Sequence, residues 1–341
     1  MGPRTEQFER EFADRVGAKH AVAVSSCTSA LHLAYLTAGV GPGDEVIVPA
    51  ITFVATAAAV RYCGATAVPA EIRGQHDLGI DPDHVDELID ERTRAVCAVH
   101  FAGYPAEMDS LRAICERRGV ALVEDAAHAP TVGPTSLSAS YSFFSNKVLS
   151  CGEGGLLASN DDEVAARARS LRSHAMTSGT WERHRGHASS YDVVGLGFNY
   201  RMDEPRAALL SARLHGLEAD VAERRRLVRR YRELLRGEDA LTIPYDDDDV
   251  DRSSCYVMPV MVAVPELREP LREYLLAHEV QTSVLYPAFH ELSEYAAGAG
   301  SLPRSELAAR TELTLPLYPH LSRADQDQVV AALRAGIREL G

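Results

Sequence analysis

The stretch HAVAVSSCTSALHLAYL, residues 20–36, contains the pattern that decides the fold. A short apolar run is followed by small polar residues and then by an apolar helical pattern around Leu31 and Leu36. The same alternation recurs at EVIVP (45–49) and FVATAAAV (53–60), TAVPA (66–70) and PDHVDELI (82–89), RAVCAVH (94–100) and MDSLRAICERRG (108–119), and VALVED (120–125). Apolar runs of about five residues alternating with helices predict an α/β protein whose mainly parallel sheet is covered on both faces.

The pattern changes beyond residue 200. Residues 205–235 predict one long helical stretch, and the acidic run YDDDDVDRSS (245–254) predicts a surface loop. After it, residues 255–287 predict strand, helix and strand, and a final helix begins at a capping box formed by Ser322 and Asp325. We therefore expect a large α/β domain over residues 1–225 and a smaller α+β domain over 226–341, with the charge run around 224–230 on a solvated face.

Composition and charge exclude several classes of protein. The 341 residues include 35 Lys and Arg and 49 Asp and Glu, a formal net charge of −14, which disfavours nucleic acid and anionic membranes as partners. The longest uncharged apolar stretch, residues 46–60, is too short to span a bilayer. The N-terminal residues MGPRTEQFERE contain no apolar run, so no signal peptide is expected.

The six cysteines form no C-x-x-C motif. Cys97 and His100 are three residues apart, but no second ligand pair completes a zinc site, and the apolar run around them predicts a buried thiol and a strand-end histidine. Scattered, reduced cysteines are typical of a cytoplasmic protein, and that is the expected location.

Three loops at the predicted carboxyl ends of strands could carry chemistry, because ligands of open α/β sheets bind there. The first, SSCTSA (25–30), opens a helix, and its backbone amides with the Thr28 hydroxyl could bind a phosphate. The same residues also fit ordinary N-capping. Neither a dinucleotide-binding glycine motif nor a P-loop is present.

The second and third loops contain charged residues next to buried strands. VALVEDAAHAP (120–130) ends a strand with Glu124 and Asp125, and a buried carboxylate is costly without a positive partner. Helix capping by Asp125 and a satisfied core His128 are the alternatives. SYSFFSNKVLSCGEGG (140–155) places Lys147 between an apolar strand and a glycine-rich turn, where desolvation favours a nucleophilic amine; an ordinary solvated lysine is the alternative.

A phosphate site, a buried carboxylate and an activated lysine together are what pyridoxal 5′-phosphate (PLP) requires. The phosphate anchors it, the lysine holds its aldehyde, and the carboxylate keeps its pyridine nitrogen protonated.

The chain also resembles the DegT-type nucleotide-sugar aminotransferases, which are fold-type I PLP enzymes. The resemblance covers nearly the whole chain. It is carried, in order, by SSCTSALHL (25–33), VPAITFVATA (48–57), VHFAGYPAEMD (99–109), VEDAAHA (123–129), SFFSNK (142–147), GEGG (152–155), GFNYRM (197–202), VLYPAFH (284–290) and LPRSELAARTELTLPLYP (302–319).

This resemblance implies roles for particular residues. Lys147 would be the Schiff-base lysine and proton shuttle, and Asp125 would be the partner of the pyridine nitrogen. The other cofactor-binding residues would be Phe53, stacked on the ring, His128 beside it, Cys27, Thr28 and Ser142 at the phosphate, and Asn199 reaching the phosphate from a neighbouring subunit. Tyr286 and His290 would border the substrate cleft, and Arg201 and Arg172 are the candidates for binding a nucleotide diphosphate.

The resemblance further implies a homodimeric PLP-dependent aminotransferase in amino-sugar or antibiotic biosynthesis. Glutamate or glutamine would donate an amino group that passes to a ketosugar, which we expect to be nucleotide-linked. A ketocyclitol or other free keto compound is the alternative acceptor. A PLP-dependent sugar dehydratase is a second alternative, but those relatives have histidine in place of the lysine at position 147.

The chain departs from the family pattern at three places. Cys27 stands where the family usually has a glycine, we expect the segment that precedes GPRTEQFE in the family to be missing, and the stretch between Asp125 and Lys147 is shorter than the family norm. We expect the cofactor site to be unaffected and one wall of the substrate cleft to be lower.

Overall fold

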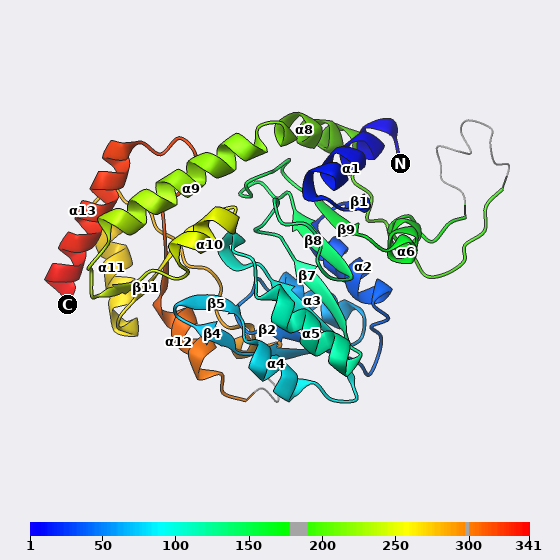
Figure 1. The fold of residues 1–341 in the computed structure, drawn as a ribbon, viewed down its shortest axis with the longest axis horizontal. Helices are drawn as coiled ribbons and strands as arrows, with labels where there is room; N and C mark the ends of the chain where they lie inside the picture. The colour runs from blue at the N-terminus through cyan, green and yellow to red at the C-terminus, as the bar shows by residue number, and fades with distance from the viewer. Residues whose placement is uncertain (178–189, 297–299) are drawn as a thin grey trace.

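The computed structural model describes residues 1–177, 190–296 and 300–341 (Figure 1). At its centre is a seven-stranded sheet with the order β1-β9-β8-β7-β6-β2-β3. Its strands are β1 (His20–Val24), β2 (Glu45–Pro49), β3 (Thr66–Ala70), β6 (Thr93–Val99), β7 (Ala121–Asp125), β8 (Ser138–Ser142) and β9 (Gly155–Ser159). The neighbours from β8 to β3 pair in parallel, and β9 is antiparallel to both β8 and β1. The predicted α/β class and mainly parallel sheet are confirmed.

Helices cover both faces of this sheet, as alternation along the strands requires. On β2, Val46 and Val48 pack in one core and Ile47 packs in another, on the opposite face. The first core belongs to α2 (Cys27–Thr37), α3 (Ala55–Tyr62) and α6 (Asp162–Arg172), and the opposite face is covered by α4 (Pro82–Leu88), α5 (Met108–Arg118) and α1 (Pro3–Val16).

The C-terminal half adds an antiparallel sheet in the order β10-β11-β12, while the first half contributes a small β4–β5 pair. The remaining elements are β4 (Ile72–Gly74), β5 (Asp77–Ile80), η1 (Phe101–Gly103), α8 (Glu204–Leu214), α9 (Leu217–Leu234), β10 (Leu241–Thr242), α10 (Asp247–Arg252), β11 (Met258–Val262), α11 (Pro265–Ala277), η2 (Phe289–Glu291), α12 (Pro303–Thr311), β12 (Glu312–Leu315) and α13 (Arg323–Leu340). Among the described residues, no helix is long and apolar enough to cross a membrane.

Several details of the C-terminal half correct the sequence predictions. The predicted helix over 205–235 is two helices, because the chain turns at Gly216 between α8 and α9. The predicted loop at 245–254 contains α10, which begins at a capping box between Asp246 and Asp249. The capping box at Ser322 and Asp325 is confirmed.

The segment 280–287 was predicted as a strand, but it meets β12 through a single bridge between Ser283 and Thr314. The backbone N–H of Leu285 instead donates to a carboxylate oxygen of Glu312 at 2.6 Å. The Leu285 N–H, which a strand would donate to a backbone carbonyl of its neighbour, is therefore bonded to a side chain instead.

Helix α9 connects the two halves of the molecule (Figure 1). It runs unbroken through residues 225 and 226, where the domain boundary was predicted, so the division into two domains stays a prediction. Arg224, which was expected on a solvated face, is buried, and its Nη1 donates to the backbone carbonyls of Tyr256 and Leu317 at 3.1 and 3.4 Å.

A buried ion pair joins the first helix to the end of α6. Arg172 Nη1 lies 2.5 Å from Glu9 Oε1, and this carboxylate oxygen also accepts the N–H of Ala23 in β1 at 2.8 Å. Both side chains are at least nine-tenths buried. Arg172 is therefore not available to a nucleotide diphosphate, which corrects the prediction for this residue.

Replacing Glu9 by alanine is expected to destabilise the protein by about 3–5 kcal/mol, because it leaves the Arg172 guanidinium buried without its carboxylate. Urea unfolding followed by circular dichroism measures this. Glu6→Ala, at an exposed position of the same helix, is the matched control and should change stability by less than about 0.5 kcal/mol. Equal losses in the two variants would contradict a stabilising role for the pair.

Candidate active site

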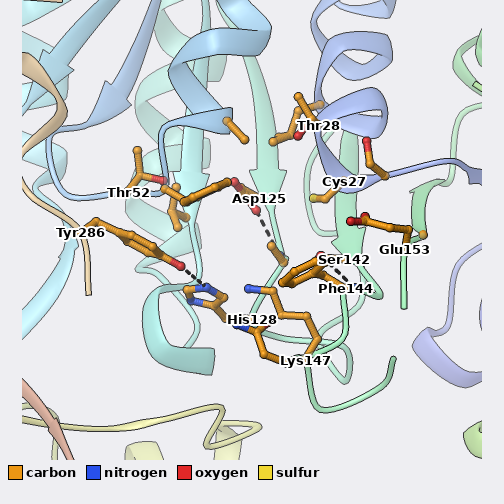
Figure 2. Close-up of a pocket in the computed structure, with 18 residues that line it drawn as sticks. Cys27, Thr28, Thr52, Asp125, His128, Ser142, Phe144, Lys147, Glu153 and Tyr286 are labelled. Atoms are coloured by element: carbon orange, nitrogen blue, oxygen red, sulfur yellow. Dashed lines mark hydrogen bonds between the residues drawn. The ribbon is translucent and has the colours of Figure 1, made fainter. Parts of the chain in front are cut away.

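A cavity of about 350 Å³ lies where the carboxyl ends of β7 and β8 meet the first turn of α2 (Figure 2). Its lining comes from six parts of the chain: the start of α2, the loop between β2 and α3 with the start of α3, the end of β6, the end of β7 with the loop after it, the end of β8 with the loop after it, and the segment before η2. The residues that matter for its chemistry are Cys27, Thr28, Thr52, Phe53, Asp125, His128, Ser142, Lys147 and Tyr286. Eight of these nine were predicted site residues.

The first turn of α2 forms one end of the cavity. Ser26 is the N-cap, and its side chain accepts the N–H of Ser29 at 3.1 Å. Cys27 and Thr28 belong to the first turn, where backbone N–H groups have no intrahelical acceptor and attract anions. The residues present therefore fit a phosphate group.

Gly155, the last residue of the GEGG motif, brings β9 against the start of α2. A Cβ at this position would collide with the backbone carbonyl of Ser26 and the amide nitrogen of Cys27. The close approach of two backbones explains why a glycine is needed here.

Asp125 and Glu124 end β7 and point to opposite sides, as adjacent residues of a strand do. Glu124 accepts a hydrogen bond from His100 at 2.9 Å, and both side chains are fully buried. Cys97 is buried as well, as predicted, and no group of metal-ligating side chains occurs in the described part of the chain. Glu124 is thus satisfied by His100 within the protein interior. Of the two carboxylates, only Asp125 faces the cavity.

The carboxylate of Asp125 is held by neutral donors. Thr56 Oγ1 donates to it at 2.8 Å and the backbone N–H of Ala127 donates at 3.0 Å. Burial raises the pKa of this carboxyl group, and the two hydrogen bonds partly oppose the increase. A buried carboxylate of this kind favours a positively charged group in the cavity, and a protonated pyridine nitrogen fits.

Lys147 extends into the cavity from the loop after β8 (Figure 2). Burial lowers the pKa of its amine to about 8, although Cys27 and Asp125 oppose the decrease. A larger fraction of the amine is therefore neutral near pH 7 than in an ordinary lysine, and the neutral amine is the nucleophile that attacks an aldehyde.

His128 connects the end of β7 to Tyr286. Its Nδ1 accepts the N–H of Ala102 at 3.2 Å, so the ring proton lies on Nε2 and is donated to the Tyr286 hydroxyl at 3.0 Å. Burial lowers the pKa of His128 well below its usual value, which keeps the ring neutral. The Tyr286 hydroxyl is left free to donate its own proton toward a ligand.

Besides Arg172, three predicted site residues lie outside this cavity. His290 is buried and lies 3.5 Å from Glu306. Asn199 and Arg201 are exposed, and their backbones bridge to Ser173 and Val24.

Sequence reasoning missed three groups that act on the predicted residues. The hydroxyl oxygens of Thr52 and Thr56 lie 2.7 Å apart, and that of Thr56 donates to Asp125. Two threonines four residues apart after a strand are a sequence pattern from which this pair could have been predicted. Tyr256 lies beside Lys147 and His128, and it comes from a distant part of the sequence that carries no such signal.

Residues 1–334 match the DegT/DnrJ/EryC1/StrS aminotransferase family. The chain belongs to this family. It is 39% identical over 346 residues to dTDP-3-amino-3,4,6-trideoxy-alpha-D-glucose transaminase of Streptomyces venezuelae, covering 98% of this chain and 87% of the relative. It is 35% identical to the spore coat polysaccharide biosynthesis protein SpsC of Bacillus subtilis, covering 98% of this chain and 89% of the relative.

Solved structures agree with this assignment. DesV of S. venezuelae, in complex with a ketimine intermediate, superposes with a TM-score of 0.90 at 38% identity, covering 98% of this chain and 89% of that chain. NtdA of Bacillus subtilis, with bound cofactor PMP, has a TM-score of 0.90 at 28% identity, covering 99% of this chain and 78% of that chain. The protein is thus a PLP-dependent aminotransferase, and the predicted family, fold class and cofactor are confirmed.

PLP supplies an electron sink and an aldehyde that can carry an amino group. The residues of the cavity divide the remaining work. The start of α2 would bind the phosphate, Asp125 would stabilise the positive charge of the ring nitrogen, and Lys147 would bind the aldehyde and act as the proton shuttle.

Asp125→Asn is expected to keep the fold and to lower the rate of the glutamate half-reaction by roughly 100-fold or more, because a neutral amide cannot stabilise the ring charge. Stopped-flow absorbance with saturating PLP measures the rate. Asp109→Asn, at a side chain 95% exposed on α5, is the control. Wild-type rates in the Asp125 variant would refute this role.

Proposed function

We propose that this aminotransferase transfers an amino group from glutamate or glutamine to a nucleotide-linked ketosugar in amino-sugar biosynthesis in the cytoplasm. The observation that carries the proposal is the meeting of Lys147, Asp125 and the start of α2 in one cavity of a chain 39% identical to a dTDP-sugar transaminase. The presence of lysine at position 147 supports transamination over dehydration.

Arg201 is the proposed contact for the nucleotide diphosphate. It follows Asn199 in the GFNYRM motif, and it is exposed. Its guanidinium could therefore bind an anion at the entrance of the active-site cavity of a second copy of the chain. A local cation is needed because the net charge of −14 repels a diphosphate at long range.

The enzyme should aminate a nucleotide-linked ketosugar, and Arg201→Ala should raise KM more than it lowers kcat, because the lost contact binds a part of the substrate that does not react. Raising the ionic strength should alter KM in the wild type and less so in the variant. Product formation from a panel of nucleotide-linked ketosugars and free ketocyclitols measures the preference, with Lys147→Ala as the inactive control. Efficient amination of a neutral cyclitol, with every nucleotide-sugar ignored, would overturn the proposed substrate class.

The active unit is proposed to be a homodimer with shared active sites. Between α6 and α8, the chain on both sides of residues 178–189 extends away from the sheet (Figure 1). Val193, Val194 and Leu196 in this part are 53%, 66% and 87% exposed. Exposed apolar side chains grouped in this way favour a protein partner. Asn199 follows directly and lies outside its own chain's cavity, so a second copy is the partner whose site it could complete.

Two inactive variants, Lys147→Ala and Asn199→Asp, should partly restore activity when they are mixed, unfolded and refolded together. One site of the mixed dimer then has a native lysine and a native asparagine, so up to about a quarter of the wild-type activity should return if subunits mix at random. The glutamate half-reaction measures this, and each variant refolded alone is the control. Full activity in a species that light scattering shows to be a monomer would contradict shared sites.

A further inference from the structure

Tyr256 places its aromatic ring beside the amino group of Lys147. The Nζ atom lies 4.4 Å from the ring centroid, within the range of a cation–π interaction. The other neighbour of the ring is His128, whose ring centroid is 4.3 Å away with the two planes inclined by 25°. Tyr256 therefore contacts both the lysine and the histidine of the active site, although it belongs to the C-terminal half of the chain.

The ring is held firmly by the backbone on both sides. Tyr256 is 7% exposed, its N–H donates to Ala102 at 3.0 Å, and its carbonyl accepts a hydrogen bond from Arg224 at 3.1 Å. Gly103 has a positive φ of 96°, and a Cβ there would collide with Ser254. This tight junction fixes the backbone from which the buried ring extends toward Lys147.

The other groups that face Lys147 do not stabilise its ammonium form once the cofactor is bound. Burial raises the pKa of the Cys27 thiol and lowers the pKa of the His128 ring, so both are neutral. Asp125 raises the pKa of the free lysine, but with PLP in the cavity its carboxylate would face the ring nitrogen. Glu153 also lines the cavity but is not among the groups that shift the pKa of Lys147. The face of the Tyr256 ring is then a further group beside the amine that favours the ammonium.

We propose that Tyr256 is a positioning residue for Lys147, whose ring holds the amino group within the cavity and stabilises its protonated form whenever the lysine is not bonded to the cofactor. Lys147 must pass between the two forms, because the neutral amine attacks the aldehyde and the ammonium delivers a proton. The role rests on Lys147 as the cofactor-binding lysine. A cation–π contact stabilises the ammonium, so its loss lowers the pKa of the lysine and moves the pH at which the free amine becomes reactive downward.

The test compares Tyr256→Phe, which keeps the aromatic face, with Tyr256→Leu and Tyr256→Met, which keep apolar bulk without it. Protein stripped of PLP is mixed with PLP at a series of pH values, and the product is reduced with borohydride. The amine of Lys147 condenses with the aldehyde of PLP and releases water, and borohydride makes the bond permanent. The fraction of protein that gains mass at Lys147 in a given time therefore measures the rate at which the neutral amine reacts at that pH.

Wild type and Tyr256→Phe should share one pH midpoint, and the Leu and Met variants should have midpoints lower by about 0.5–1 pH unit. Thermal melting identifies any variant that fails to fold, and the other aliphatic variant then carries the comparison. Equal midpoints in wild type and a folded aliphatic variant would overturn the role of Tyr256 alone. A wild type that gains no mass at Lys147 would overturn the assignment of the lysine, and this proposal with it.

Discussion

The burial of one carboxylate, Asp125, is the constraint on which the rest of the site depends. An ionised carboxylate at the end of a buried strand costs free energy unless hydrogen bonds and a positive charge compensate it. The protein supplies the hydrogen bonds through Thr56 and the backbone of Ala127. Under the proposed role of Asp125, the ring nitrogen of PLP would supply the positive charge, and cofactor binding would then be coupled to the electrostatics of this strand end.

The central place of β7 explains why distant segments converge on this charge. Strands β6 and β8 flank it in parallel, so the loops at their carboxyl ends lie beside Asp125. The loop after β8 brings Lys147, and α3 brings Thr56. The C-terminal half contributes Tyr286 to the lining of the cavity. It also places the Tyr256 ring against the amino group of Lys147.

Local patterns were sufficient to predict the sheet, the capped start of α13, and the residues that follow strand ends. Lys147 follows one apolar run and Asp125 ends another, and both positions can be recognised from neighbouring residues alone. The parallel pairing of β7 and β8 then brings the two side chains to the same edge of the sheet. Contacts made between segments far apart could not be predicted in this way. The burial of Arg224 depends on carbonyl groups in two other segments, and the irregular chain at 280–287 depends on the side chain of Glu312. The sequence around Arg224 also fits a solvated helix face, and the sequence of residues 280–287 also fits a strand.

Gly155 has a consequence for how this enzyme could change its specificity. The start of α2 is located by direct contact between two main chains, with no side chain between them. This contact does not depend on the side chains of the loops that face the substrate, whereas the rest of α2 packs in one core with Phe198 and Phe289 of those segments. Loop substitutions that spare these two core residues could therefore reshape the cleft for a different keto acceptor while the first turn of α2, with its anion-binding amides, stays against β9.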